Sequence, residues 1–301
     1  MAGSDESASI ASEELSSASS KSSSSGKEEQ GSMQATGGWG LDKRVRGACE
    51  QGEALVQHVQ RCIQTRAGND VVLMFICYAS RLSGTALSMV SRALRQQQGG
   101  AATRRASRQA GKLAGRMEAL SSMISETRAV GRLWGLLGLY LAGRSAGQKG
   151  MEEGMAASAL AQAQIASLII FQAAENIALL GSKKIVAVGA AAQERLGVLS
   201  VRAWGVYVML ELVRLLHERM GKRKKGMGGG GGGGGGEKGE VEEWSEAEDG
   251  AWKRSFAQNL AWAPLTVHWG VKGGVLAEWV VSVLAMYPAT GAMRDLWRET
   301  A

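Results

Sequence analysis

The chain has 301 residues, with 45% hydrophobic and 21% charged side chains and a formal net charge of +7. Its three cysteines show no CxxC spacing and its three histidines are far apart, which argues against a disulfide-rich secreted protein and a conventional metalloenzyme. No HExxH, GxSxG, GxGxxG or P-loop pattern occurs. We therefore expect no enzyme, no catalytic residue, no bound metal and no cofactor.

The charges are segregated along the chain. Residues 1–32 hold six acidic residues against two lysines, whereas residues 42–149 hold 17 Lys or Arg against six Asp or Glu, a local excess of 11. Such a basic block can contact the phosphates of nucleic acid or of anionic lipid. The residue types next to the charges indicate which of the two partners is favoured.

Two segments have the composition of flexible chain. Residues 1–38 are rich in Ser, Ala, Gly and Glu, hold too little apolar surface to fold, and lack the apolar core of a signal peptide. Residues 221–250 join a basic run, nine consecutive glycines and an acidic run. We expect a disordered tail at the first segment and a flexible linker at the second.

The stretches between these segments have helical periodicity. Residues 41–66 and 70–97 repeat apolar residues mostly at helical steps, and sustained alternation of period two is absent. We predict an all-α, membrane-associated fold with amphipathic helices and one or two weak transmembrane helices. The predicted regions are the tail 1–38, an amphipathic region 39–150, a central membrane-associated region 151–220, the linker 221–250 and a C-terminal helical segment 251–301.

Residues 104–138 predict an amphipathic helix. Four apolar residues share an arc of about 60° at about 100° per residue: Leu113, Met117, Leu120 and Ile124. Cations accompany this arc along the helix: Arg108, Lys112, Arg116, Arg128 and Arg132. The pattern is typical of an interfacial membrane helix, with apolar residues in one leaflet and cations on anionic headgroups. The alternative is a bundle helix whose basic face is solvated.

Two stretches have the length and composition of weak membrane spans. Residues 155–174 carry no charge, and residues 273–292 carry only Glu278. Residues 198–217 contain Arg202, Glu211 and Arg214, so we interpret them as a bundle or interface helix. The pair Glu175 and Asn176 favours a helix–helix hydrogen bond over transport chemistry.

Four stretches, in order, resemble the peroxin-11 family of peroxisomal membrane proteins, in its fungal C-type branch. The first runs from Gly68 through Asp70 to Leu73, with Tyr78 after it, and the second from Thr127 through Arg132 and Trp134 to Leu136. The third runs from Glu175 and Asn176 to Ser182 and Lys183. The fourth runs from Asn259 through Pro264 to His268 and Trp269. Together they cover about residues 40–301, and neither the tail nor the polyglycine run belongs to the family pattern.

The resemblance implies a peroxisomal membrane protein that elongates the membrane before fission and so controls organelle number and size. It implies insertion of an amphipathic helix, here 112–132, and self-association into a homo-oligomer. It also implies cooperation with a tail-anchored fission adaptor and a dynamin-like GTPase. Two alternatives stay open: a peroxisomal pore for small metabolites that uses Glu175, and a soluble basic bundle that binds nucleic acid. The latter ranks last, because its arginines lack interleaved aromatic residues.

Overall fold

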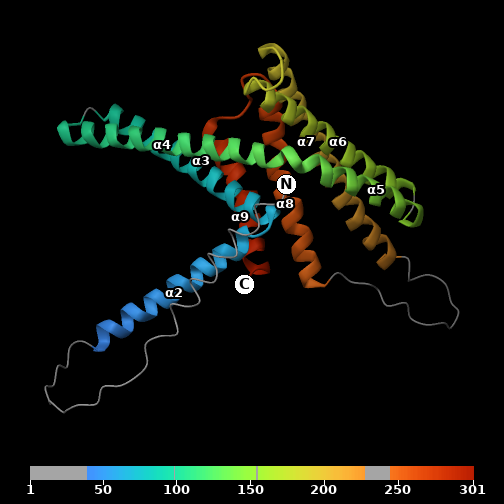
Figure 1. The fold of residues 1–301 in the computed structure, drawn as a ribbon, viewed down its shortest axis with the longest axis horizontal. Coiled ribbons are helices and arrows are strands. Elements are labelled where there is room, and N and C mark those ends of the chain that lie inside the picture. Colours follow the sequence, from blue (N-terminus) through green and yellow to red (C-terminus); the bar gives the residue numbers. More distant parts are fainter. Residues whose placement is uncertain (1–38, 98, 154, 228–244) are drawn as a thin grey trace, which may run out of the picture. The chain divides into compact units, whose positions relative to one another are not determined.

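The computed structural model describes residues 39–97, 99–153, 155–227 and 245–301. All regular secondary structure in these residues is helical, which confirms the predicted all-α class (Figure 1). The elements are α2 (Trp39–Ile63), α3 (Arg66–Gln96), α4 (Ala101–Gly131), the 3₁₀ turn η1 (Arg132–Trp134), α5 (Gly135–Glu153), α6 (Met155–Ser182), α7 (Ala190–Met227), α8 (Glu246–Gly270) and α9 (Glu278–Glu299). The chain divides into two compact units, Met1–Ala54 and Leu55–Ala301. The described part of the first is the beginning of α2, and the second contains the rest of α2 and the other helices.

Local capping sets several helix ends. The Thr65 hydroxyl accepts from the Gly68 amide at the start of α3, and Ser245 forms a capping box with Glu248 at the start of α8. The predicted tail, 1–38, and the polyglycine run lie outside the described residues. Within the predicted linker 221–250, residues 221–227 belong to α7 and residues 246–250 belong to α8.

Helices α3 and α4 form an antiparallel hairpin whose seam consists of small residues seven positions apart. The Cys77 thiol donates to the Ser121 carbonyl at 3.4 Å, and Ser91 and Ser107 each donate to the other's carbonyl at 2.9 Å. Between these pairs, a Cβ on Gly84 would lie 3.3 Å from the Ala114 carbonyl oxygen. Small side chains let the two backbones approach closely, so the seam fixes both register and rotation of the pair.

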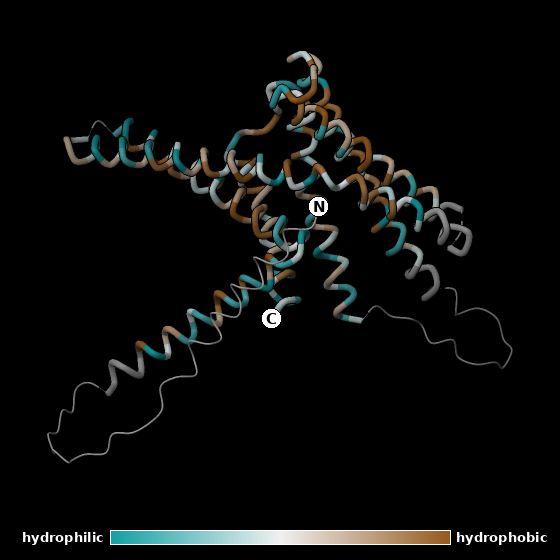
Figure 2. Tube along the Cα trace, viewed as in Figure 1, coloured by the Kyte–Doolittle hydropathy of each residue, from teal (hydrophilic) through white to brown (hydrophobic). Residues whose placement is uncertain are grey.

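Helices α5, α6 and α7 pack side by side, and α6 and α7 are antiparallel neighbours. Hydrophobic residues run along most of both (Figure 2). Within the described residues three helical stretches are long and apolar enough to cross a membrane: Arg66–Gln96, Ala157–Ser182 and Ala190–Gly221. The chain is therefore an all-α membrane-associated protein, with three candidate spans rather than one or two.

Two span predictions need correction. Residues 198–217 lie inside a candidate span, because the apolar residues of α7 outweigh its few charges. Residues 273–292 do not form one helix: α9 begins at Glu278, and Gly273 and Gly274 have positive φ in the preceding loop. That loop wraps His268, whose Nδ1 accepts the amides of Val275 and Leu276 at 3.0 Å. A Cβ on Gly274 would lie 2.2 Å from the His268 ring, so the loop requires glycine there.

Helices α8 and α9 pack against each other, α8 also contacts α7, and α9 also contacts α3. Leu265, Val281 and Ala285 are completely buried and form a small core, against which Tyr78 and Trp262 pack. The C-terminal end of α9 meets the end of α2, where the ring centroids of His58 and Trp297 lie 3.8 Å apart at a tilt of 31° and the Cys62 sulfur contacts the Thr300 hydroxyl. The i, i+4 pair His58 and Cys62 thus takes part in helix packing.

Candidate functional site

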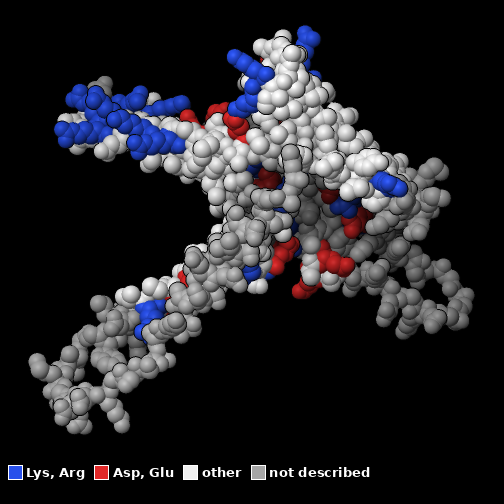
Figure 3. All heavy atoms as spheres, viewed as in Figure 1, with Lys and Arg blue, Asp and Glu red and all other residues white. Residues whose placement is uncertain are grey.

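The turn end of the α3–α4 hairpin carries a concentrated positive charge. No Asp or Glu occurs between Asp70 and Glu118, whereas eight Lys or Arg do. Seven of these cations lie along the half of the hairpin nearest the turn (Figure 3): Arg92, Arg95, Arg104, Arg105, Arg108, Lys112 and Arg116. All seven are exposed, and none forms a salt bridge with a carboxylate of the described residues. We call these seven residues the basic tip.

The predicted apolar arc of α4 is distributed between surface and interior. Leu113 is 43% exposed, Met117 and Leu120 are half-buried, and Ile124 is only 6% exposed. Ile124 thus differs from the expectation of a lipid-facing residue. The reason is that α4 packs on α3 through the small-residue seam beside this arc, a contact that the hydrophobic pattern of α4 alone does not reveal.

The last two predicted headgroup ligands are instead paired inside the chain. Arg128 donates Nε to Asp70 Oδ1 at 2.8 Å and Nη2 to Asp70 Oδ2 at 3.0 Å. Burial lowers the pKa of Arg128, but the hydrogen bonds and charge of Asp70 outweigh that effect, so the guanidinium pKa lies above its usual value. Arg132 donates Nε and Nη2 to the two carboxylate oxygens of Glu175 at 2.7 and 2.6 Å. Both are fork-to-fork pairs, which hold geometry as well as charge.

Helix α6 binds the 3₁₀ turn between α4 and α5 through three polar side chains, Gln172, Glu175 and Asn176. Gln172 Nε2 donates to the Arg132 carbonyl at 2.8 Å, and Asn176 Nδ2 donates to the Leu133 carbonyl at 3.3 Å. A 3₁₀ turn between two α-helices leaves carbonyls in need of donors, and these amides supply them. We call Arg132, Gln172, Glu175 and Asn176 the polar junction. It shows the helix–helix hydrogen bonding expected for Glu175 and Asn176.

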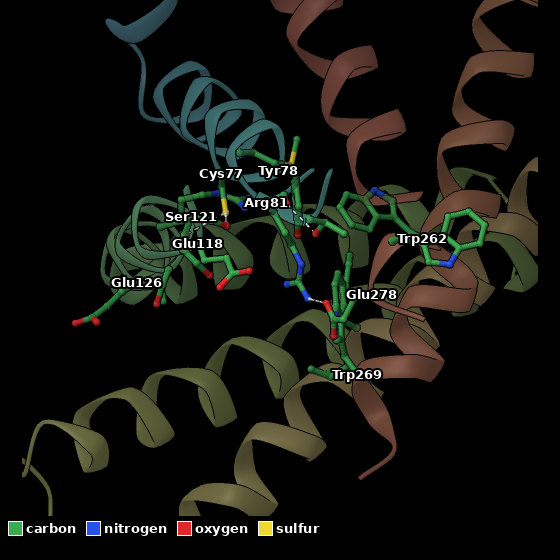
Figure 4. A pocket seen from close by; sticks show the side chains of 18 of the residues that line it. Cys77, Tyr78, Arg81, Glu118, Ser121, Glu126, Trp262, Trp269 and Glu278 are labelled. Carbon is green, nitrogen blue, oxygen red and sulfur yellow. Dashed lines mark hydrogen bonds and ion pairs between the residues drawn. The ribbon is translucent and has the colours of Figure 1, made fainter. Parts of the chain in front are cut away.

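A cavity of about 1400 Å³ lies between the hairpin and the helices α6 to α9. One wall is an aromatic row in which Tyr78, Trp262, Trp204 and Trp269 follow one another with ring centroids 5.7, 5.1 and 6.2 Å apart. Across the cavity Arg81 donates to Glu278 at 2.9 Å (Figure 4). The other charged residues of this region include Asp70, Arg128, Arg132 and Glu175, already joined in pairs. The cavity therefore combines an aromatic wall with largely neutralised ionic groups.

The remaining motif residues have structural contacts or lie at the surface. A Cβ on Gly68 would lie 2.1 Å from the Cys62 carbonyl oxygen, so only glycine fits where α3 begins. Lys183 pairs with Glu126 on α4, and the Ser182 hydroxyl donates to Leu179. The other positions are a half-buried Leu73, a 69% exposed Trp134, Pro264 inside α8, the loop-binding His268 and the stacked Trp269.

Sequence reasoning missed three contributors to this region. Gln172 carries a signal, since it precedes Glu175 and Asn176 by one helical turn and shares their face. The aromatic row and the Arg81–Glu278 pair join residues up to 197 positions apart, so no local sequence pattern predicts them. Comparison with known proteins found no matching family model, no matching curated protein and no matching solved structure.

Proposed function

We propose that this chain is a peroxisomal membrane protein that remodels and elongates the membrane before fission. The observation that carries the proposal is the basic tip beside the apolar side of α4: a dense, unpaired positive charge next to exposed apolar residues such as Leu113. Cations of this kind bind anionic headgroups while apolar side chains enter the acyl region. Each cation near an anionic surface contributes roughly 1 kcal/mol at most.

Three further features support a lipid partner over nucleic acid. The chain has three helices with the length and hydropathy of membrane spans. Large apolar side chains such as Leu137, Tyr140 and Leu141 are more than 60% exposed on α5, a surface that suits lipid better than water. The basic tip also has no interleaved aromatic residues on which bases could stack.

The peroxisomal membrane as the site of action rests on the four motif stretches and their order. Two ion pairs join residues of different motif stretches, Asp70 with Arg128 and Glu175 with Arg132, and Lys183 pairs with Glu126, which directly precedes the second stretch. A common scaffold is a physical reason for these residue types to occur together. Self-association, a tail-anchored adaptor and a dynamin-like GTPase belong to the proposal on the same basis.

The mechanism is tested with full-length protein and vesicles of phosphatidylcholine with and without phosphatidylserine. We expect binding and tubulation of the anionic vesicles only. Leu113→Glu should abolish tubulation but keep salt-sensitive binding, because the cations remain while the apolar insertion is lost. Leu113 is the better choice than Ile124, since an exposed site tolerates Glu without disturbing the fold. Unchanged tubulation by Leu113→Glu contradicts the mechanism.

The location is tested in cells with a fluorescent fusion and alkaline carbonate extraction. We expect peroxisomal membrane labelling, a pellet fraction that resists extraction, and fewer, larger peroxisomes when the chain is absent. Labelling of another organelle refutes the peroxisomal part of the proposal and leaves membrane remodelling open. Release into the carbonate supernatant refutes integral insertion.

A metabolite pore is the second candidate, because the cavity contains charged side chains among candidate spans. In this geometry Glu175 is bound bidentately by Arg132, so its charge is neutralised within the chain. Purified protein in planar bilayers tests the pore directly. Conductance that changes in Glu175→Gln supports it, and bilayers that stay silent reject it.

A further inference from the structure

The rotation of the hairpin about its seam gives it two distinct sides. Tyr78, Arg81 and Thr85 of α3, with Glu118 and Ser122 of α4, line the cavity on one side. At about 100° per residue, these positions are rotated about the helix axis by roughly 40–120° from the seam residues, all in the same direction. The α9 residues Glu278 and Ser282 contact Arg81 and Thr85, which places α9 on this same side.

The opposite side of the hairpin is apolar in both helices. Its residues lie roughly 60–120° from the seam in the other sense: Ile76, Leu87, Val90 and Leu94 from α3, and Leu113, Met117 and Leu120 from α4. We call this set the hairpin face. Ile76, Val90 and Leu113 are 39, 51 and 43% exposed, and the other four are half-buried. The apolar arc of α4 is therefore half of a wider surface.

The charges beside the hairpin face indicate the chemistry of a partner that would fit it. Arg105, Lys112 and Arg116 follow the α4 edge of the hairpin face, and no carboxylate occurs in residues 71–117. An apolar strip bordered by unpaired cations fits an anionic lipid surface, where acyl chains meet phosphates.

The register decides between a spanning and a surface-lying hairpin. Because Ser107 pairs with Ser91 and Ser121 with Cys77, the charged residues Lys112, Arg116 and Glu118 lie beside the middle of the apolar part of α3. If α3 crossed the bilayer, these charges would sit at hydrocarbon depth, where an ionised side chain is strongly unfavourable. A hairpin lying along the interface keeps them at the headgroups.

We infer that the lipid-binding surface is the two-helix hairpin face, and that α3 and α4 enter the leaflet as a closed pair, not α4 alone. This inference rests on the proposed function. Separation of α4 would break the reciprocal hydrogen bonds of Ser91 and Ser107 and expose the small polar seam. The closed pair keeps those bonds and presents a strip two helices wide, which displaces more lipid in one leaflet than a single helix does.

A disulfide lock tests whether the pair stays closed. The Ser121 hydroxyl lies 3.5 Å from the native Cys77 sulfur, so S121C places two thiols across the seam. Cys49 is exposed and is replaced by serine, whereas Cys62 and Cys77 are buried. A second lock, S91C with S107C, replaces two hydroxyls 3.4 Å apart near the turn. The control adds Cys77→Ser to S121C, which cannot crosslink.

We expect oxidised and reduced S121C to bind phosphatidylserine vesicles with affinities within about threefold of each other, and to tubulate them equally. A loss of about tenfold or more on oxidation, reversed by reductant and absent from the control, overturns the inference and leaves the proposed function intact. Failure of the unmodified chain to bind these vesicles refutes both.

An environment-sensitive fluorophore locates the surface independently. It is attached to V90C on α3, to L113C on α4, or to S122C on the cavity side, each with Cys49 replaced by serine. We expect an increase of about twofold or more in emission with anionic vesicles at positions 90 and 113 and little change at position 122. A response at 113 without one at 90 shows that α4 enters alone and contradicts the shared face.

Discussion

The two ends of α4 use the same residue type in opposite ways. At its N-terminal end, Arg104, Arg105 and Arg108 are exposed and have no carboxylate partner among the described residues. At its C-terminal end, Arg128 and the capping residue Arg132, which begins the 3₁₀ turn, are each held by both oxygens of a carboxylate from another helix. One helix therefore carries a surface available to an anionic partner at one end and a structural joint at the other.

This difference explains why one charge pattern cannot be assigned one role. A guanidinium that is already neutralised by a bidentate carboxylate attracts a lipid phosphate only weakly. An unpaired guanidinium at the surface contributes little to folding but strongly to the field that an approaching membrane experiences. Substitutions at the two ends should therefore separate stability from binding.

The largest effect is expected at the polar junction. Arg132→Ala leaves Glu175 without its partner at a site where the carboxylate side chain is only 21% exposed, and it should destabilise the fold by about 3 kcal/mol. Thermal unfolding in detergent measures the loss, with Arg108→Ala near the N-terminal end of α4 as the control. Arg132→Met combined with Glu175→Gln should recover most of the stability, since neither partner is then left charged and unpaired. Equal losses of stability for Arg132→Ala and Arg108→Ala contradict the division of α4 into a structural end and a lipid-binding end.

The opposite result is expected at the basic tip. Replacing Arg108, Lys112 and Arg116 together with glutamine should weaken binding to anionic vesicles by about 2 kcal/mol, or roughly thirtyfold, because each cation contributes at most about 1 kcal/mol. The unfolding temperature should stay within error of the unmodified chain. Sedimentation with vesicles at low and high salt measures the effect, which salt should also reduce in the unmodified chain. A stability loss comparable to that of Arg132→Ala shows that the tip has a folding role.

The seam that orients the tip gives a third, smaller effect. Gly84→Leu forces atoms into the space occupied by the Ala114 carbonyl and Met117, and overpacking of this kind should cost about 1–2 kcal/mol. Gly115→Ala is the matched control, because nothing lies within 4 Å of its Cβ position. That change should stabilise the helix by about 0.5–1 kcal/mol, since alanine is a better helix former than glycine. Chemical unfolding compares the two variants. A change of the same sign in the free energy of unfolding for both substitutions contradicts a tightly packed seam.

The sequence predicted the helical class and the amphipathic helix because both depend on local periodicity. Helix ends such as the Ser245 capping box also have local causes. The hairpin face was not predictable, since the apolar residues of α3 and α4 become one surface only through the register of Cys77 with Ser121. The pairing of Arg128 and Arg132 was equally hidden, because their partners come from helices 58 and 43 residues away. The prediction of one spanning helix over 273–292 was wrong for a local reason. Its first residues form a loop that needs glycines at positive φ to wrap His268.

The smallest effect separates a surface salt bridge from the polar junction. Hydrogen bonds from Lys253 and from Arg219 hold the pKa of Asp249 below its usual value, where the start of α8 meets α7. Because the folded-state pKa is depressed, this carboxylate stabilises the fold above its unfolded pKa, and the contribution is lost as the pH falls through the folded pKa. Unfolding temperatures of the unmodified chain and of Asp249→Asn, measured from neutral pH downwards, should therefore converge in acid. The difference in unfolding temperature at neutral pH should be far smaller than that of Arg132→Ala. The two carboxylates are similarly buried, but the cations on Asp249 are 41% and 65% exposed against 27% for Arg132, so water and salt screen them more. An equally large difference for Asp249→Asn and Arg132→Ala shows that the exposure of the cations is not what distinguishes the two sites.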